Sequence, residues 1–162
     1  MKKTLLIIIL IFSQLIIAQE KKSIVGEWKV VSVDNGEVYL NAKTDSVSTS
    51  KEFDKIHNNK VSRQDGIAEI RAFSSHNEFI FTENKDFKLY LDYRRNENTL
   101  RLSGTYEIID QKNMTLKVEG RTKRLMNKTA EFEFINNQLI FKFEYIASRK
   151  NKPTIYVLEK IK

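Results

Sequence analysis

The 162-residue sequence contains no cysteine. It therefore has no disulfide, no thiolate metal ligand and no cysteine nucleophile. It also lacks the lipid-acceptor cysteine of a bacterial lipoprotein. Without disulfides, the fold must be stable through side-chain packing alone.

Glycine, proline and histidine are scarce, at five, one and two residues. No glycine-rich phosphate loop and no Gly-x-Ser-x-Gly nucleophile elbow is present. His57 and His76 have no companion at metal-ligand spacing, so we interpret both as surface residues. Glu131 and Glu133 share one strand face, which is expected on a solvated surface rather than in a catalytic cleft. These absences predict a non-enzyme without cofactor or metal, although some families of this shape include enzymes.

The N-terminal segment has the features of a secretory signal peptide. Two lysines follow the initial methionine, an apolar run extends from Leu5 to Ile17, and Ala18 is a small residue suited to cleavage. The run is too short to span a bilayer comfortably. We expect a signal peptide at 1–18 and an exported, soluble chain at 19–162, periplasmic or secreted, with no transmembrane span. An uncleaved anchor is the alternative.

The sequence is basic, with a formal net charge of +7. Its basic clusters lie between apolar stretches, where solvated turns belong. Nucleic-acid binding would require a basic stripe with exposed aromatic side chains. We therefore predict no nucleic-acid partner, and an anionic membrane surface or an acidic glycan fits the positive field better.

Apolar and polar residues alternate with period two over most of the chain, which predicts strands with one buried and one wet face. We expect strands at Ile24–Val33, Val38–Leu40, Ile67–Ser74, Glu78–Glu83, Phe87–Tyr93, Leu100–Ile108, Met114–Glu119, Ala130–Phe134, Leu139–Tyr145 and Thr154–Lys160. The connections are short and rich in turn residues, which suits antiparallel hairpins and leaves no room for crossover helices. Such a sheet closes into a barrel or folds as two layers.

Residues 41–66 interrupt this pattern, because they are polar and lack a sustained period. Thr49-Ser50-Lys51-Glu52 has the spacing of a capping box, and Phe53 and Ile56 follow at a helical interval. We therefore predict a short helical insertion near residues 49–60. It is either a lid over one end of a barrel or a surface loop with one helical turn.

Two motifs carry a family resemblance. Gly26-Glu27-Trp28 opens the first strand with the only tryptophan, and Gly104-Thr105-Tyr106 begins a later Gly-x-Tyr strand. In this order they resemble the lipocalin-like (calycin) families over roughly residues 24–161. The resemblance implies an all-β, antiparallel, up-and-down lipocalin-like β-barrel in a single domain.

The same resemblance implies specific roles for some residues. Gly26 and Trp28 are the structural motif, and Trp28 is expected to pack at the closed barrel end against a basic side chain, either Arg149 or Lys160. The Thr-Asp-Tyr motif of the better-known lipocalins is missing, and Leu91-Asp92-Tyr93 echoes it only loosely. The C-terminal Arg-x-Tyr pair of intracellular fatty-acid-binding relatives is also absent, which argues against a fatty-acid headgroup clamp.

What the resemblance implies for function is binding of a small hydrophobic molecule inside the barrel. An eight-stranded barrel either holds one small ligand or is filled by its own side chains. The candidate pocket residues are the inward-facing aromatics Trp28, Phe87, Tyr106, Phe132, Phe134, Phe141, Phe143 and Tyr145. We expect a non-catalytic carrier or sequestering protein. The alternative is a protein–protein interaction module of the inhibitor or immunity type, with a filled barrel, an unspecified protein partner and recognition through loops.

Overall fold

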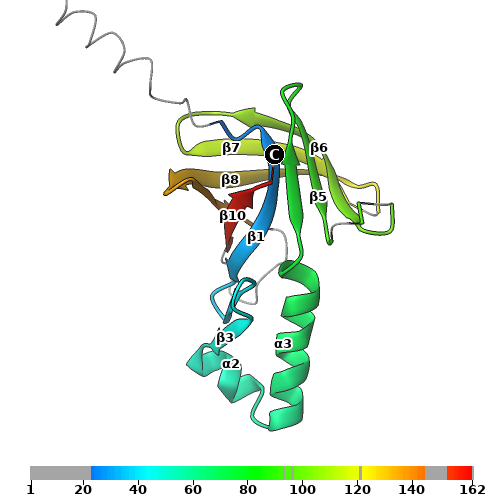
Figure 1. Ribbon diagram of the computed structural model, residues 1–162. Coiled ribbons are helices and arrows are strands. Elements are labelled where there is room, and N and C mark those ends of the chain that lie inside the picture. Colours follow the sequence, from blue (N-terminus) through cyan, green and yellow to red (C-terminus); the bar gives the residue numbers. More distant parts are fainter. Residues whose placement is uncertain (1–22, 93, 96, 121, 145–152, 162) are drawn as a thin grey trace, which may run out of the picture.

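Eight antiparallel strands close into a barrel in the computed structural model, and a separate arm projects from one end of it (Figure 1). The structure describes residues 23–92, 94–95, 97–120, 122–144 and 153–161. The elements are β1 (Gly26–Asp34), β2 (Val38–Asn41), β3 (Ser46–Thr49), α2 (Lys51–Ile56), α3 (Lys60–Ser74), β4 (Glu78–Phe81), β5 (Asp86–Tyr90), β6 (Leu100–Ile108), β7 (Asn113–Glu119), β8 (Leu125–Ile135), β9 (Gln138–Phe143) and β10 (Thr154–Lys160).

The barrel is a meander. Strands β4 to β10 each pair with the next strand in the chain, and β1 lies between β4 and β10. The pairing of β1 with β10 closes the sheet, so that neither strand leaves an open barrel edge. The predicted all-β, antiparallel, up-and-down barrel is confirmed.

One edge of strand β1 pairs with β10, and its other edge pairs first with the barrel and then with the arm. Its first half pairs with β4, where Lys29 faces Glu78, and its second half pairs with β2, where Ser32 faces Asn41. The pairing with β10 has a register shift between Val30 and Ser32. Because such a bulge bends and twists a strand, it lets β1 leave the barrel wall and start the arm.

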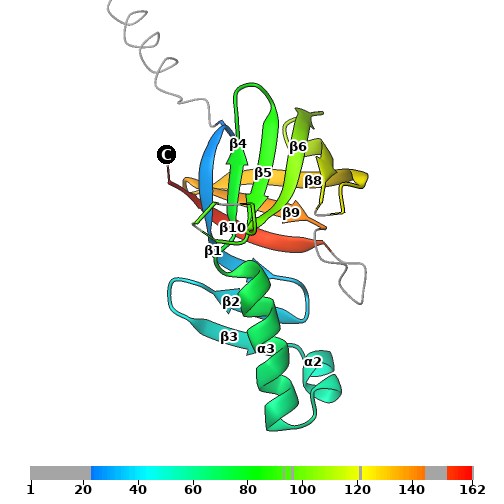
Figure 2. The same ribbon diagram turned by 90° about the vertical axis from the view of Figure 1, so that its right-hand side faces the viewer.

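The arm, which we define as residues 35–77, contains the β2–β3 hairpin and both helices. Figure 2 shows α3 lying across this hairpin, and in both views the arm extends away from the barrel. It is therefore a projection and not a lid. The predicted insertion is confirmed, with Ser50 as the cap of α2, where its side chain accepts a hydrogen bond from the backbone N–H of Phe53.

One predicted strand in the arm is wrong, because Ile67–Ser74 forms the second half of α3. Asn59 caps this helix by accepting a hydrogen bond from the backbone N–H of Ser62 at 2.9 Å. Ile67 and Ile70 are three residues apart and therefore lie on one helix face, turned away from solvent more than Ala68 and Glu69. The few apolar residues of 67–74 fit the period of a strand as well as that of a helix, and the cap that marks the helix lies before this segment, at Asn59.

A small internal core holds the two helices of the arm together. Phe53 is buried, and its ring centroid lies 4.3 Å from that of His57. Gly66 allows this packing, since a Cβ atom there would lie 2.9 Å from carbons of both rings. His57, predicted to be a surface residue, is instead partly buried, with Nδ1 2.8 Å from Oγ of Ser62.

The helices are also joined by an exposed polar network. Asp54 accepts hydrogen bonds from Arg63 Nε at 2.9 Å and from Thr49 Oγ1 at 2.8 Å. These two hydrogen bonds hold the pKa of Asp54 below its ordinary value, and the bond from Arg63 has the larger effect. A carboxyl group whose pKa is lower in the folded state adds stability above its unfolded pKa and loses that contribution as the pH falls through the folded pKa.

We therefore expect the arm to loosen in acid before the barrel does. Amide hydrogen-exchange protection in α2 and α3 should be constant near neutral pH and should decrease below about pH 4. Asp54→Asn should lower this protection at neutral pH and remove most of its acid dependence. Asp65→Asn, an exposed position on α3 outside the network, is the matched control and should retain the acid dependence. Equal behaviour of the two variants would contradict the assignment.

Aromatic rings fill the centre of the barrel. The ring of Phe79 lies 5.6 Å from Phe141 and 5.0 Å from Tyr156, and Phe81 lies 5.3 Å from Tyr106 in an edge-to-face arrangement. Such pairs stabilise the core beyond simple area burial. The barrel centre is thus a packed aromatic core.

Trp28 lies at the end of the barrel where β1 begins. It is buried, and its indole N–H donates to the carbonyl oxygen of Ile24 at 2.8 Å. Lys160 Nζ is 5.7 Å from its ring centroid, within the range of a cation–π contact. Of the two basic residues considered for this position, Lys160 occupies it, and Arg149 lies outside the described residues. Lys160 is therefore the basic side chain that packs against Trp28.

Candidate site at the open end of the barrel

The opposite end of the barrel has a shallow pocket of about 280 Å³. Its apolar lining comes from the ends of four adjacent strands, β6 to β9, and consists of Leu102, Val118, Met126 and Phe143. Polar groups at its rim are Arg101, Lys128 and Glu144. We call this set the mouth pocket. Its apolar surface with a few polar groups at the edge is typical of small-molecule sites.

Strand register explains why these residues meet. Val118 faces Met126 across the β7–β8 pair, and Leu102 is one position before the pair formed by Ser103 and Glu119. Alternation turns every second residue inward, so residues far apart in the sequence share one interior face.

Lys128 is a cation on this interior face. It faces Leu116 across the β7–β8 pair and follows the same alternation as the buried Ala130 and Phe132. Its side chain is 31% exposed, and Nζ is 3.8 Å from the carboxylate of Glu144. At this distance and exposure the ion pair is weak, so the ammonium group can contact an anionic ligand.

A buried hydroxyl lies next to the pocket. Thr154 is only 2% exposed and faces Phe143 across the β9–β10 pair, and its Oγ1 has no hydrogen-bond partner among the residues that the structure describes. A buried polar group without a partner is costly and is usually satisfied by water or by a ligand. The open end therefore provides a polar group beside an apolar surface.

The aromatic residues predicted as pocket candidates lie mainly in the core. Phe143 lines the mouth pocket and Tyr106 lines a groove on the outer wall. The remaining described candidates pack among other interior side chains: Trp28, Phe87, Phe132, Phe134 and Phe141. Tyr145 lies outside the described residues. Sequence reasoning missed Leu102, Val118, Met126 and Lys128. Alternation within the expected strands placed Leu102 and Val118 on an interior face, but Met126 and Lys128 precede the expected strand Ala130–Phe134, and β8 in fact begins at Leu125.

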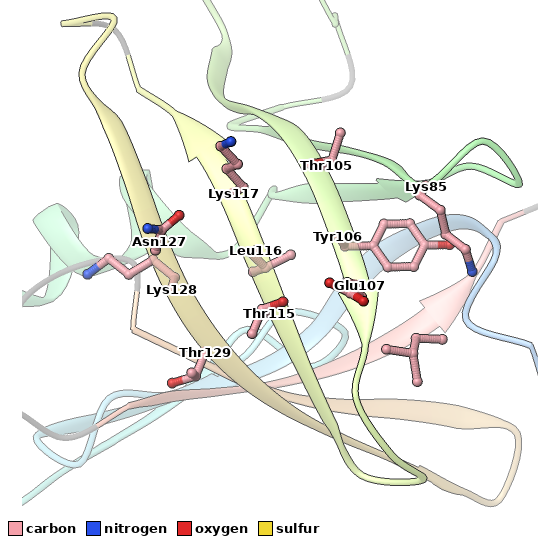
Figure 3. A pocket seen from close by; sticks show the side chains of 11 residues that line it. Lys85, Thr105, Tyr106, Glu107, Thr115, Leu116, Lys117, Asn127, Lys128 and Thr129 are labelled. Carbon is pink, nitrogen blue, oxygen red and sulfur yellow. The ribbon is translucent and has the colours of Figure 1, made fainter.

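A larger groove of about 780 Å³ runs over the outer wall of the barrel (Figure 3). Figure 3 shows Thr105 and Glu107 on β6, Thr115 and Lys117 on β7, and Asn127 on β8. These side chains are polar and carry both signs of charge, and the groove is also bordered by Tyr106, Ile108 and Leu116. It is the ordinary solvated face of an antiparallel sheet, and we therefore regard the mouth pocket as the better candidate site.

An arginine ties the loop between β5 and β6 to the outer wall of the barrel. Arg95 donates to Glu27 on β1 at 2.8 Å and also to Glu78 on β4. The hydrogen bonds that Arg95 donates, first to Glu27 and second to Glu78, raise the pKa of Arg95 above its usual value, so the guanidinium is always charged. The clamp fixes this loop relative to two strands of the barrel.

Within the part of the chain that the structure describes, no group of three histidine, aspartate or glutamate side chains is arranged to hold a metal ion. No helix formed by the described residues is long and apolar enough to cross a bilayer. Comparisons with models of protein families, with curated proteins and with solved structures found no match for this chain.

Proposed function

We propose that this protein is an exported, non-catalytic binding protein with a lipocalin-like barrel, and that it takes a small amphiphilic molecule at its open end. The mouth pocket carries the proposal, because it joins an apolar surface to the ammonium group of Lys128. Export is inferred from the signal-like sequence at 1–18. The order of the Gly26-Glu27-Trp28 and Gly104-Thr105-Tyr106 motifs supports a place among the lipocalin-like families.

The dimensions of the site limit the ligand. Aromatic side chains fill the barrel centre, and a pocket of about 280 Å³ is near the lower bound for drug-sized molecules. Binding would be driven by burial of the apolar part of the ligand against Met126, which is partly exposed, whereas Val118 and Phe143 are fully buried. An acidic end of the ligand would lie near Lys128, with its remaining polar atoms hydrated.

Dye binding tests the proposal with defined probes. We expect the mature protein to bind the anionic dye 1-anilinonaphthalene-8-sulfonate and the neutral dye Nile red, each with increased fluorescence. Met126→Trp should fill the pocket and weaken both dyes at least about tenfold, because no space remains for the apolar contact. Lys128→Met should weaken only the anionic dye, by about fivefold, as expected for one partly exposed charge.

Leu125→Trp provides the matched control. Leu125 is adjacent to Met126 but lies on the outer face of β8 and is exposed, so the same substitution should leave both affinities unchanged. A similar loss from both tryptophan variants would contradict a site at the barrel mouth. Native mass spectrometry of protein purified from its own host should then show a bound small molecule that is released on denaturation.

The arm supports a second candidate function, that of a protein–protein interaction module with a filled barrel. Ile56 and Val61 are 49% and 67% exposed near the α2–α3 connection, where a folded arm presents them to solvent. Exposed apolar side chains on a projecting element are typical of recognition surfaces. If neither dye binds and the native mass is that of the chain alone, the carrier function fails and this second candidate is favoured.

A further inference from the structure

The hairpin of the arm ends in an open strand edge. Among the residues that the structure describes, β3 is the last strand of the sheet and pairs only with β2. The backbone N–H of Ser50 donates to the carbonyl oxygen of Glu37, and the register then places Ser48 in a hydrogen-bonded pair with Tyr39. Because these pairs alternate along an antiparallel ladder, the main-chain groups of Val47 and Thr49 point to the free edge.

This edge lacks the usual protection against pairing with another chain. Open edges in natural proteins commonly carry lysine, proline or a bulge, or are covered by another element. β3 has the sequence Ser46-Val47-Ser48-Thr49, with no charge and no proline, and its two serines are exposed. Two of its four residues are β-branched, which favours strand pairing. Its short length is the only common protective feature present.

The segment is complementary to itself when it is turned by a two-fold rotation about Ser48. An antiparallel copy in this register pairs Val47 with Thr49, which are the residues whose main-chain groups face the free edge. Beyond the ends of the strand, Asp45 lies in the preceding turn and Lys51 begins α2. In the two-fold arrangement the Asp45 end of each copy lies next to the Lys51 end of the other, so that opposite charges approach each other on both sides of the axis. If one copy of β3 were shifted by one residue along the other, the main-chain hydrogen bonds would be lost. A shift by two residues would keep these bonds but would move the opposite charges apart.

We propose that the protein forms a two-fold symmetric dimer in which β3 pairs antiparallel with β3 of a second copy. The two hairpins then make one continuous sheet, ordered β2, β3, β3 and β2. Tyr39, which is 39% exposed, lies beside Ser48 in the hairpin, so a tyrosine from each copy flanks the central pair of serines. The interface is isologous, since the same patch serves both copies. This proposal is independent of ligand binding at the barrel mouth.

Single-cysteine variants test the register directly, because the native chain has no cysteine. Ser48 would form a non-hydrogen-bonded pair with its symmetry mate, with Cα atoms about 4.5 Å apart. This distance suits a disulfide. Ser48→Cys should therefore give mostly covalent dimer under mild oxidation, as seen on a non-reducing gel and by intact mass.

Ser46→Cys is the matched control. Ser46 is equally exposed on the same strand face, but its symmetry mate would be four residues out of register, or roughly 13 Å away. This variant should remain monomeric in the same oxidation. Equal cross-linking of both variants would indicate random collision, and no cross-linking of Ser48→Cys in a folded protein would exclude the pairing. Either result overturns the proposal.

Charge reversal provides a second measurement, by sedimentation equilibrium of the full mature chain. Lys51→Glu should raise the dimer dissociation constant about tenfold, because both charge pairs become repulsive. Asp45→Lys should act in the same direction, and it also removes an exposed ion pair with Arg71. Combining the two should restore most of the affinity. A monomeric native chain, or a double variant as weak as the single ones, would refute the dimer.

Discussion

Gly104→Ala is expected to prevent stable folding of the barrel. A Cβ atom at this position would lie 2.1 Å from the carbonyl oxygen of Lys117 and 2.8 Å from Cα of Val118. Both are backbone atoms of β7, so no side-chain rotation relieves the overlap. The φ angle of Gly104 is +157°, a value that other residues rarely adopt. We expect a loss of at least about 4 kcal/mol in the free energy of unfolding, a large part of the stability of an ordinary domain.

Gly120→Ala is the control that separates this close approach from the general cost of replacing a glycine, because Gly120 lies just beyond the end of β7. The nearest atom to a Cβ at Gly120 is the methyl carbon of Met126 at 3.6 Å, an ordinary contact. We expect a change within about 0.5 kcal/mol for this control. Chemical denaturation followed by far-ultraviolet circular dichroism measures both variants. A Gly104→Ala variant as stable as the Gly120→Ala variant would show that β6 and β7 are further apart than described.

Phe141→Ala is the second large effect. The Phe141 ring is completely buried, and its centroid lies 5.6 to 5.7 Å from those of Phe79, Phe81 and Phe143. Removing it leaves a cavity among side chains that all belong to rigid strands, so collapse around the space is limited. The expected cost is about 3–5 kcal/mol.

Ile140→Ala is its control on the same strand. Ile140 is only partly buried and faces away from the barrel interior, so its truncation should cost about 1 kcal/mol or less. Thermal and chemical unfolding should rank the two variants in this order. The reverse order would mean that the inner and outer faces of β9 have been exchanged.

The barrel could be predicted from the sequence because its strands alternate so regularly. In β5, β6, β7 and β9 the charged residues fall on one face, as in Lys117 and Glu119 of β7, and the turns before β7 and before β9 are marked by asparagine and aspartate. Such local signals define both the strand and its buried side. The same regularity predicted that the aromatic residues would face inward.

The arm was harder to predict because its signals are weak or depend on context. β3 contains three hydroxyl residues and one valine, so no apolar period marks it as a strand. Its pairing depends on β2, which is itself held by the second half of β1. The segment 67–74 was assigned as a strand because its few apolar residues fit either period over so short a range.

The mouth pocket could not be located from the sequence for a different reason. Its lining depends on which residues of four neighbouring strands reach the same height in the barrel, and this is set by register. Alternation shows that Lys128 shares a face with Phe132, but not that it lies at the open end. The choice of Lys160 as the cation beside Trp28 likewise depends on the β1–β10 pairing.

Closure of the barrel by β1 and β10 has a consequence for the order of synthesis. β1 is synthesised first, but β10 pairs with it along most of its length and is synthesised last. β1 therefore stays without this partner until nearly all of the chain has been produced. During that time, any sheet already formed has two unpaired edges, which favour association with other nascent chains. The meander from β4 to β9 forms from near neighbours, whereas the final pairing joins distant segments and is therefore slow. A chain truncated before residue 154 would thus form an aggregation-prone open sheet rather than a slightly smaller barrel.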